Sequence, residues 1–356
     1  TFMNESGYTL YKSGSTPYRD LFASINLQAD EVIFGRDYEA SLSVLHNVQN
    51  YENSTTMGRP GMNKKIVNSY LMADGSRFTD KAGYETMTFD QECQNRDPRL
   101  AQTIRTPGYT RIGSTKKEAP NLAYTMTGYH LIKYSMTANY DEYNKSCNDI
   151  PLFRTAEVYL NFAEAKAELG TLKQADINKS IKLLRDRVGM TNLDMELANS
   201  KPDPYLMSAA TGYPNVKGAN QGVILEIRRE RTIELAMEGF RYYDIMRWKE
   251  GKLFENDLLG IYVPGPGTYD LDKDGTDDVC FYVGTKPAGN VPLYLEIGEQ
   301  IRLSNGESGY IICHSLITKK WNEDRDYLYP VPISERTLSN GVITQNPGWN
   351  DGLNFN

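Results

Sequence analysis

Two consecutive amphipathic helix patterns, separated by a short turn, limit the fold of this chain more than any other feature. The first pattern places one apolar side chain on the same helical face at each turn, at Val158, Phe162, Ala165 and Leu169. The second pattern repeats this spacing at Ile177, Ile181, Leu184 and Val188. Gly170 and Gly189 follow the two patterns directly and mark the C-terminal ends of two helices.

Two helices joined by a tight turn form an αα-hairpin, the unit from which tetratricopeptide-like solenoids are built. Ala163 and Ala167 are small side chains that permit close approach of a neighbouring helix. The chain has no clear 34-residue period, so one hairpin is expected here rather than a repeat array.

A third helix is predicted over Val223–Met237 and a fourth over Tyr242–Lys249, after a Pro- and Gly-rich connection over residues 190–221. The third helix is dense in charge, with Glu226, Arg228, Arg229, Glu230, Arg231, Glu234 and Glu238 in or beside it. Paired carboxylates can serve acid–base catalysis. Glutamates four residues apart repel one another on one helix face unless arginines lie between them. We therefore interpret this helix as part of an ion-pair network that holds helices together.

The remaining sequence is rich in loops. A strand or buried extended segment is expected at Val32-Ile33-Phe34, a short helix at Asn63–Met72, and extended pieces at Ala101–Arg105 and Tyr129–Met136. The predicted fold is mostly α, a tetratricopeptide-like helical scaffold with long loop-rich excursions and short strands. We expect a single domain over residues 1–356, with a loop-rich ligand-binding part at about 1–150, the hairpin and charged helix at about 151–252, and a loop-rich C-terminal part at 253–356.

Several classes of protein are excluded. The net charge is -7 and the basic residues form no run longer than two, so nucleic acid is not expected as a partner. No apolar stretch is long enough to cross a membrane as a helix. The four cysteines form no CxxC pair, which leaves zinc binding unsupported and favours free thiols. No G-x-S-x-G elbow and no metal-binding histidine pair occurs.

Residues 270–278, DLDKDGTDD, follow the pattern D-x-D-x-D-G-x-x-D. Calcium prefers six to eight oxygen ligands, and this spacing lets carboxylates at loop positions one, three and five converge on one ion. The expected ligands are Asp270, Asp272, Asp274, the backbone carbonyl of Thr276, and Asp278 directly or through water. Phe281 stands where an EF-hand loop has its bidentate Glu. The sequence predicts a calcium ion with a structural role, and the alternative is a solvated acidic turn.

Three segments together resemble the SusD/RagB family. They are RTAEVYLNFAEAKAEL at Arg154–Leu169, ILEIRRERTIELAMEGFRYYDIMRW at Ile224–Trp248 and DYLYPVPISERTLSNGVITQNPGW at Asp326–Trp349. The shorter pieces NRDPRL (Asn95–Leu100) and IVNSYLMADG (Ile66–Gly75) also look like family segments. The resemblance extends from about Asp30 to the C-terminus.

The resemblance implies a lipid-anchored protein on the cell-surface side of the outer membrane of a Bacteroidetes-type bacterium. Such proteins sit over a SusC-type TonB-dependent transporter and hold a ligand, usually an oligosaccharide, without cleaving it. Family chains are longer, with further helical repeats before the point where this chain begins. We therefore expect this chain to be the C-terminal two-thirds or so, with the lipidated Cys and several helices in the missing part.

A sugar ring has one apolar face that stacks on aromatic rings, while its hydroxyl groups need polar partners. The chain has 25 Tyr residues, and many lie in its loop-rich parts. The candidates for ligand contact are Tyr38, Tyr51, Tyr84, Tyr109, Tyr124, Tyr140 and Tyr143. The alternative for each of them is packing at the edge of the core.

Three other functions compete with glycan capture. The first is capture of a peptide or glycopeptide by the same kind of system, and the second is a helical-repeat scaffold that binds only proteins. A scaffold of that kind would not need so many tyrosine-bearing loops. The third is a glycoside hydrolase, which needs two carboxylates flanking a sugar bond. No pattern in the sequence points to such a pair, so we expect no enzymatic activity.

Overall fold

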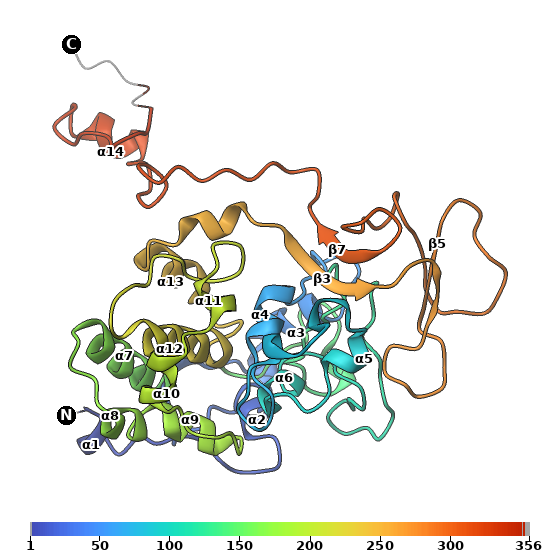
Figure 1. Ribbon diagram of the computed structural model, residues 1–356, viewed down its shortest axis with the longest axis horizontal. Helices are drawn as coiled ribbons and strands as arrows, with labels where there is room; N and C mark the ends of the chain where they lie inside the picture. Colours follow the sequence, from blue (N-terminus) through green and yellow to red (C-terminus); the bar gives the residue numbers. More distant parts are fainter. Residues whose placement is uncertain (1, 351, 353–356) are drawn as a thin grey trace.

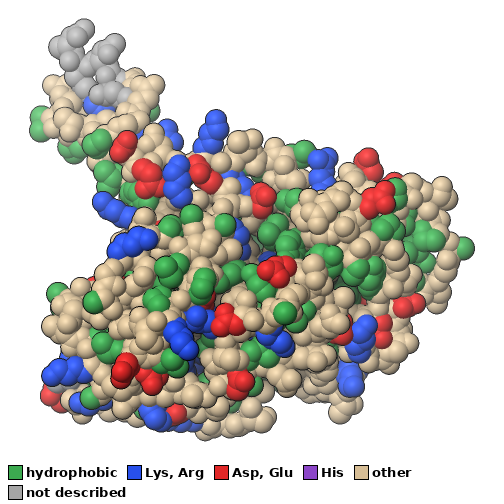
Figure 2. All heavy atoms as spheres, in the orientation of Figure 1, with side chains coloured by type: hydrophobic (Ala, Val, Ile, Leu, Met, Phe, Trp, Pro, Cys, Tyr) green, Lys and Arg blue, Asp and Glu red, His purple; other side chains and the backbone are tan. Residues whose placement is uncertain are grey.

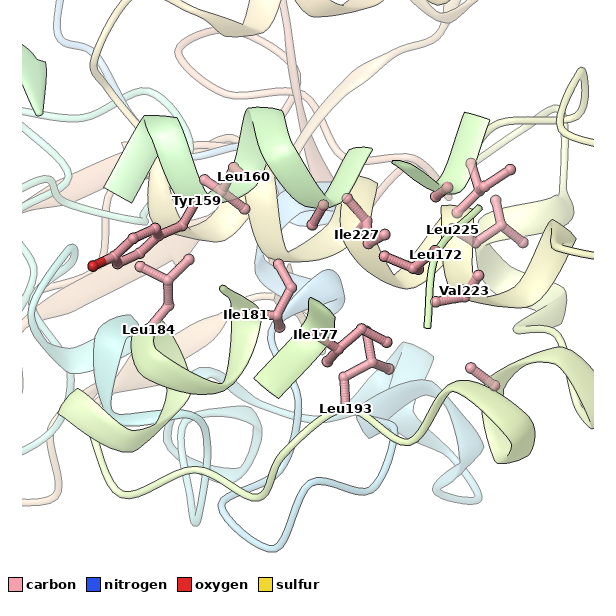
Figure 3. Close-up of a cluster of buried hydrophobic side chains, with 14 of the residues drawn as sticks. Tyr159, Leu160, Leu172, Ile177, Ile181, Leu184, Leu193, Val223, Leu225 and Ile227 are labelled. Carbon is pink, nitrogen blue, oxygen red and sulfur yellow. The ribbon is translucent and has the colours of Figure 1, made fainter. Parts of the chain in front are cut away.

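The helical hairpin predicted at residues 154–189 is present and packs against the buried helix α12 (Gln221–Glu234). The computed structural model describes residues 2–350 and residue 352. Helix α7 (Thr155–Glu168) ends just before Gly170, whose φ of 69° is left-handed, and the chain turns back into α8 (Gln174–Asn178) and α9 (Ile181–Arg187). Side chains of these helices and of α12 (Gln221–Glu234) meet in one hydrophobic cluster (Figure 3).

The predicted buried face of α7 is wrong. Val158 and Phe162 are half-buried, Ala165 is exposed, and Leu169 is 75% exposed. The buried apolar side chains are Ala156, Tyr159, Leu160, Ala163 and Ala167. Four of these follow the same helical spacing as the predicted set, shifted by two positions, which corresponds to the opposite side of a helix. Ala156, Ala163 and Ala167 belong, with Tyr159 and Leu160, to the cluster that α7 shares with α12, whereas Val158 and Phe162 do not.

The second predicted helix is interrupted at Ser180, where the backbone leaves helical conformation (φ −134°, ψ −89°). Three of the four positions of its predicted face are confirmed, because Ile177, Ile181 and Leu184 are fully buried, while Val188 is half-buried. The connection over residues 190–221 contains two short helices that the sequence did not predict, α10 (Met195–Ser200) and α11 (Pro204–Met207). The third and fourth predicted helices are α12 and α13 (Arg241–Arg247).

Helix α12 is buried along its length, and every residue from Gly222 to Glu234 has little solvent exposure. Its N-terminal end touches the backbone of α10, since a Cβ atom on Gly222 would lie 1.8 Å from the carbonyl oxygen of Ala198. A helix with so many buried charges needs a partner for each of them. Arginines from distant parts of the chain provide these partners for the glutamates at positions 230 and 234.

Ten buried charged side chains form one connected set of ion pairs, which we call the central ion-pair cluster. Its cations are Arg99, Arg154, Arg185, Arg187 and Lys133, and its anions are Asp97, Glu31, Glu230, Glu234 and Glu238. Five positive and five negative charges balance. The members come from both the loop-rich and the helical parts, so the cluster joins them and confirms the structural interpretation of α12.

Glu234 lies at the middle of the central ion-pair cluster. Its Oε1 accepts hydrogen bonds from Arg154 (2.7 Å) and Arg187 (2.6 Å), and its Oε2 accepts one from Arg99 (3.1 Å). Burial alone would raise the pKa of Glu234, but these three arginines outweigh it and hold that pKa well below its usual range.

The first 154 residues form short elements connected by long loops. The helices are α1 (Phe2–Glu5), α2 (Pro17–Ala23), α3 (Val48–Glu52), α4 (Lys64–Ser69), α5 (Phe89–Glu92) and α6 (Pro98–Ala101), with 3₁₀ turns at Ala40–Leu42, Phe78–Asp80, Tyr84–Thr86 and Ala138–Tyr140. Strand β1 (Val32–Arg36) pairs antiparallel with β2 (Ile150–Arg154), with Val32 opposite Arg154. The expected extended pieces at 101–105 and 129–136 meet only at an isolated bridge between Ile104 and Leu131.

The C-terminal part contains small sheets and a long extended segment (Figure 1). After a 3₁₀ turn at Gly251–Glu255, β3 (Leu258–Val263) pairs antiparallel with β7 (Gly309–Cys313). Between them, β4 (Gly267–Tyr269), β5 (Val279–Tyr282) and β6 (Tyr294–Glu296) form a three-stranded sheet. The chain then runs outward to α14 (Ile333–Leu338), which projects from the body of the molecule (Figures 1 and 2).

These elements confirm a mostly α fold with loop-rich excursions and short strands. Among the described residues, no helix has the length and apolar character needed to span a membrane. The four cysteines are free thiols, as the sequence favoured.

Candidate functional site

Two segments nearly a hundred residues apart in sequence, 37–52 and 138–149, lie side by side. The backbone N–H of His46 donates to the carbonyl of Ser146 (2.9 Å), and the Asn47 amide donates to Asn144 Oδ1 (3.0 Å). Asn50 donates to the carbonyl of Asp141 (2.7 Å). These bonds join α3 and the loop before it to the loop that leads into β2.

Four of the seven candidate tyrosines lie on these two segments. Tyr143 is 64% exposed and Tyr51 is 49% exposed, while Tyr38 and Tyr140 are half-buried. We call these four residues the tyrosine surface. The structure therefore places these four tyrosines on two paired segments, which the sequence could not group, and it leaves Tyr51 and Tyr143 exposed.

Neighbouring side chains support the two half-buried rings. The ring of Tyr38 contacts the His46 ring edge-on at 4.4 Å between centroids, and the guanidinium of Arg36 lies 5.1 Å from the Tyr38 centroid. His46 is itself anchored, because its Nε2 lies 2.9 Å from the carbonyl oxygen of Asn148. The adjacent Cys147 thiol raises the pKa of the Tyr140 hydroxyl, which remains protonated at neutral pH. The Tyr38 ring is thus held in place by its neighbours before any ligand binds.

Two asparagines that were not among the predicted site residues, Asn47 and Asn144, lie on the same two segments as the tyrosine surface. Asn47 is the residue that precedes α3, the helix that carries Tyr51. Asn144 accepts the Asn47 amide proton and lies next to Tyr143 in the chain. Amide groups provide both donors and acceptors for hydroxyl groups. A sequence pattern could have indicated these asparagines, since both segments, NVQNYEN and NYDEYN, combine Asn and Tyr residues.

The other three candidate tyrosines lie elsewhere. Tyr84 is half-buried, with its ring against Phe78 and Tyr205. Tyr109 is buried between the guanidinium groups of Arg19 and Arg105, so its ring faces are not open to a ligand. Tyr124 is half-buried and contacts the His130 ring. For Tyr109 in particular, the alternative of core-edge packing describes the observed environment.

The acidic loop at residues 270–278 connects β4 to β5 in the three-stranded sheet. One carboxylate oxygen from each of Asp270, Asp272 and Asp278 lies within 4.8 Å of the other two. Within the loop, Asp270 Oδ2 accepts the N–H of Gly275 (2.9 Å) and Asp278 Oδ2 accepts the N–H of Leu271 (2.7 Å). The predicted carboxylate ligands at positions one, three and nine therefore converge.

Asp274 and Thr276, the other two predicted ligands, are exposed residues on the same loop. Asp274 Oδ1 accepts the N–H of Thr276 (2.8 Å). Burial, followed by the charge of Asp274, raises the pKa of Asp272. Burial also raises the pKa of Asp278 to about 6. The loop thus concentrates negative charge with little local compensation.

A cleft of about 450 Å³ lies beside the acidic loop. One wall consists of Asp274 and residues 276–279, and the facing wall consists of residues 116–123. A second cavity, of about 420 Å³, lies between residues 122–126 and β7. Its lining contains apolar side chains such as Met126 and Ile311, together with Arg59, Glu299 and Arg302, and no Tyr, Phe or Trp.

Two carboxyl groups have a pKa near neutrality. Burial raises the pKa of Glu52 to about 7 and that of Glu250 to about 7. Glu52 accepts the hydroxyl of Ser135 (2.6 Å), and Glu250 accepts the amide of Asn215 (3.1 Å), so both are tied into the surrounding structure. Each side chain is almost fully buried, which separates it from a ligand on the surface.

The comparisons with known proteins identify the family. A family model described as the SusD family matches residues 28–349. The fold is similar to that of a SusD-like protein from Bacteroides fragilis, with a TM-score of 0.61 and 21% identity over 97% of this chain and 60% of that chain. It is also similar to a SusD-like carbohydrate binding protein from Bacteroides fragilis, with a TM-score of 0.57 and 20% identity over 94% of this chain and 58% of that chain.

At these identities the two structures share the fold with this chain, which spans about three-fifths of their length. A comparison with curated protein sequences finds no match. The resemblance carried by the helical hairpin, the charged helix and the C-terminal segment is confirmed by the family match over nearly all of the sequence. The chain belongs to the SusD family.

Proposed function

We propose that this protein captures oligosaccharides at the outside of the outer membrane and does not cleave them. The observation that carries the proposal is the tyrosine surface, whose exposed rings, Tyr51 and Tyr143, lie on two segments that are joined by an Asn47–Asn144 hydrogen bond. Apolar sugar faces stack on tyrosine rings, and sugar hydroxyl groups exchange hydrogen bonds with amides. The description of one similar structure as a carbohydrate binding protein supports this choice of ligand class.

The exposure of the tyrosine surface fits capture better than catalysis. Tyr51 and Tyr143 present about half or more of their area to solvent, so both rings are open to a ligand from the surface. A glycoside hydrolase places two carboxyl groups about 5 to 10 Å apart on either side of the scissile bond. The two carboxyl groups whose pKa is raised to about 7, Glu52 and Glu250, are buried and already hydrogen-bonded.

Membership of the SusD family supports the rest of the proposal. We place the protein on the cell surface of a Bacteroidetes-type bacterium, beside a SusC-type TonB-dependent transporter to which it delivers its ligand. A lipid anchor would hold it there.

A glycan array tests the proposal. Wild-type protein should bind one class of glycan, and the double variant Tyr51→Ala/Tyr143→Ala should lose most of that binding. Tyr243→Ala is the matched control, because Tyr243 is as exposed as Tyr143 (64%) but lies on α13. After incubation with the bound glycan, no new reducing ends should appear. Release that depends on a single Asp or Glu would contradict the non-catalytic role.

A peptide or glycopeptide is the second candidate ligand, and the cavity of about 420 Å³ favours it. That cavity combines an apolar lining with Arg59, Glu299 and Arg302 and has no tyrosine or tryptophan for stacking, which suits a peptide side chain better than a sugar ring. A negative glycan array combined with binding to a peptide library, lost on Arg59→Ala, would favour this candidate. Binding only to protein partners would instead favour the scaffold alternative.

A further inference from the structure

The acidic loop between β4 and β5 has an uncompensated buried charge. Asp272 is 7% exposed, and its Oδ2 has no hydrogen-bond partner. The other carboxylate oxygen, Asp272 Oδ1, accepts a hydrogen bond from the backbone N–H of Asp274 (3.2 Å). A buried carboxylate oxygen without a donor is costly unless a cation or a proton satisfies it.

Protein cations do not satisfy this group. Among the described residues, Asp270, Asp272 and Asp278 form no ion pair with Lys or Arg. The basic residue inside the loop, Lys273, is exposed and its Nζ lies 3.9 Å from Asp90 instead. Lys117, an exposed residue on the facing wall of the cleft, exerts a weak attraction on Asp272. The three converging carboxylates, including the Asp272 oxygen that has no hydrogen-bond partner, therefore lack a paired cation.

We propose that the 270–278 loop binds one calcium ion through Asp270, Asp272 and Asp278, with Asp274 and the Thr276 carbonyl completing the protein ligands. Calcium accepts six to eight oxygen ligands in a flexible geometry and uses loops of this spacing. Magnesium requires a strict octahedron and gives up its water reluctantly, so it fits the site less well. Phe281 occupies the twelfth position without a carboxylate, so affinity should be in the weak range of extracellular calcium modules, about 10⁻⁴–10⁻³ M.

Calcium binding would fix one wall of the neighbouring cleft. Asp274 and Thr276 through Asp278 form that wall, and they belong to the loop that the ion would organise. Both ends of the loop are anchored in the three-stranded sheet, since Tyr269 pairs with Val279 across β4 and β5. The ordering effect is therefore confined to the loop and its cleft. This inference does not depend on the proposed glycan ligand.

The test compares the wild type with Asp272→Asn and with Asp277→Asn. The matched control, Asp277, is exposed, lies in the same loop and is not part of the converging set. Each protein is treated with EDTA and then dialysed against about 2 mM calcium, a concentration above the dissociation constant expected for this class of site. Metal analysis should then find one calcium per chain in wild type and Asp277→Asn and none in Asp272→Asn. Calcium should raise the melting temperature of the first two proteins only, and magnesium should have a smaller effect.

A second readout separates loss of the ion from a general folding defect. In EDTA, Asp272→Asn should melt at a higher temperature than the wild type, because the substitution removes an unpaired buried charge. Asp278→Asn should also abolish the calcium response. The proposal is overturned if wild type holds no calcium under these conditions, or if Asp272→Asn binds it as well as wild type does.

Discussion

Replacing Glu234 with Gln removes one charge from the central ion-pair cluster while nearly preserving the shape of the side chain. The cluster then has five positive and four negative charges, all removed from water. The amide oxygen of Gln can still accept hydrogen bonds from Arg154 and Arg187 in the place of Oε1. The amide nitrogen then faces Arg99, so two donors meet where a donor and an acceptor met before.

Breaking a buried ion pair by neutralising one partner costs about 3–5 kcal/mol, since the remaining charge stays buried without compensation. We expect Glu234→Gln to destabilise the protein by about this amount, a large share of the roughly 5–15 kcal/mol that stabilises an ordinary domain. Glu168→Gln is the control. The Glu168 side chain is 47% exposed and lies 3.4 Å from Arg228, so its replacement should cost less than about 1 kcal/mol.

Urea denaturation measures both variants, and a lower midpoint with an unchanged slope reports lost stability. The effect should also depend on pH. The pKa of Glu234 is lowered in the folded protein, so its contribution is complete above the unfolded pKa, near 4.3, and is lost as the pH falls towards the folded value. The gap between wild type and Glu234→Gln should therefore narrow below about pH 4. If Glu234→Gln unfolds within about 1 kcal/mol of wild type at pH 7, the cluster does not have the role assigned to it.

Two further substitutions test the packing around the site and the scaffold. Burial raises the pKa of Glu52 from 4.5 to about 7, so ionisation of this side chain lowers the stability of the wild type as the pH rises through this range. In urea titrations, the free energy of unfolding of Glu52→Gln should therefore rise relative to that of the wild type by roughly 3 kcal/mol between pH 5 and pH 8. A difference between the two proteins that does not change with pH would contradict this. Gly222→Ala should destabilise by roughly 3 kcal/mol, because its Cβ would overlap the carbonyl of Ala198, and a urea midpoint equal to that of wild type would show that α10 shifts without cost.

Local patterns were the part of the fold that the sequence could predict. Hydrophobic spacing located the helices, and the glycines at 170 and 189 marked where they end. The buried face of α7 was wrong because two apolar sets with the same period occur on opposite sides of the helix. Only the neighbouring helix decides between them, and its packing against α7 involves the small alanines rather than Val158 and Phe162.

Interactions between distant residues were beyond the sequence. The acidic loop was predicted because its converging carboxylates lie within nine consecutive residues. The tyrosine surface depends instead on bonds such as that between Asn47 and Asn144, which are 97 residues apart. The charges of α12 likewise predicted ion pairs, but the sequence did not identify the partners. Arg154, for example, is 80 residues from Glu234.

Isothermal titration calorimetry with the glycan that the array selects tests the central claim most directly. The measurement compares wild type, Tyr51→Ala/Tyr143→Ala and the equally exposed control Tyr243→Ala. A stacked ring contributes about 1.4 kcal/mol, roughly a tenfold change in Kd, so the double variant should bind about 100-fold more weakly. The control should bind like wild type. Equal affinity of all three proteins would mean that the glycan binds elsewhere and that the tyrosine surface is not the capture site.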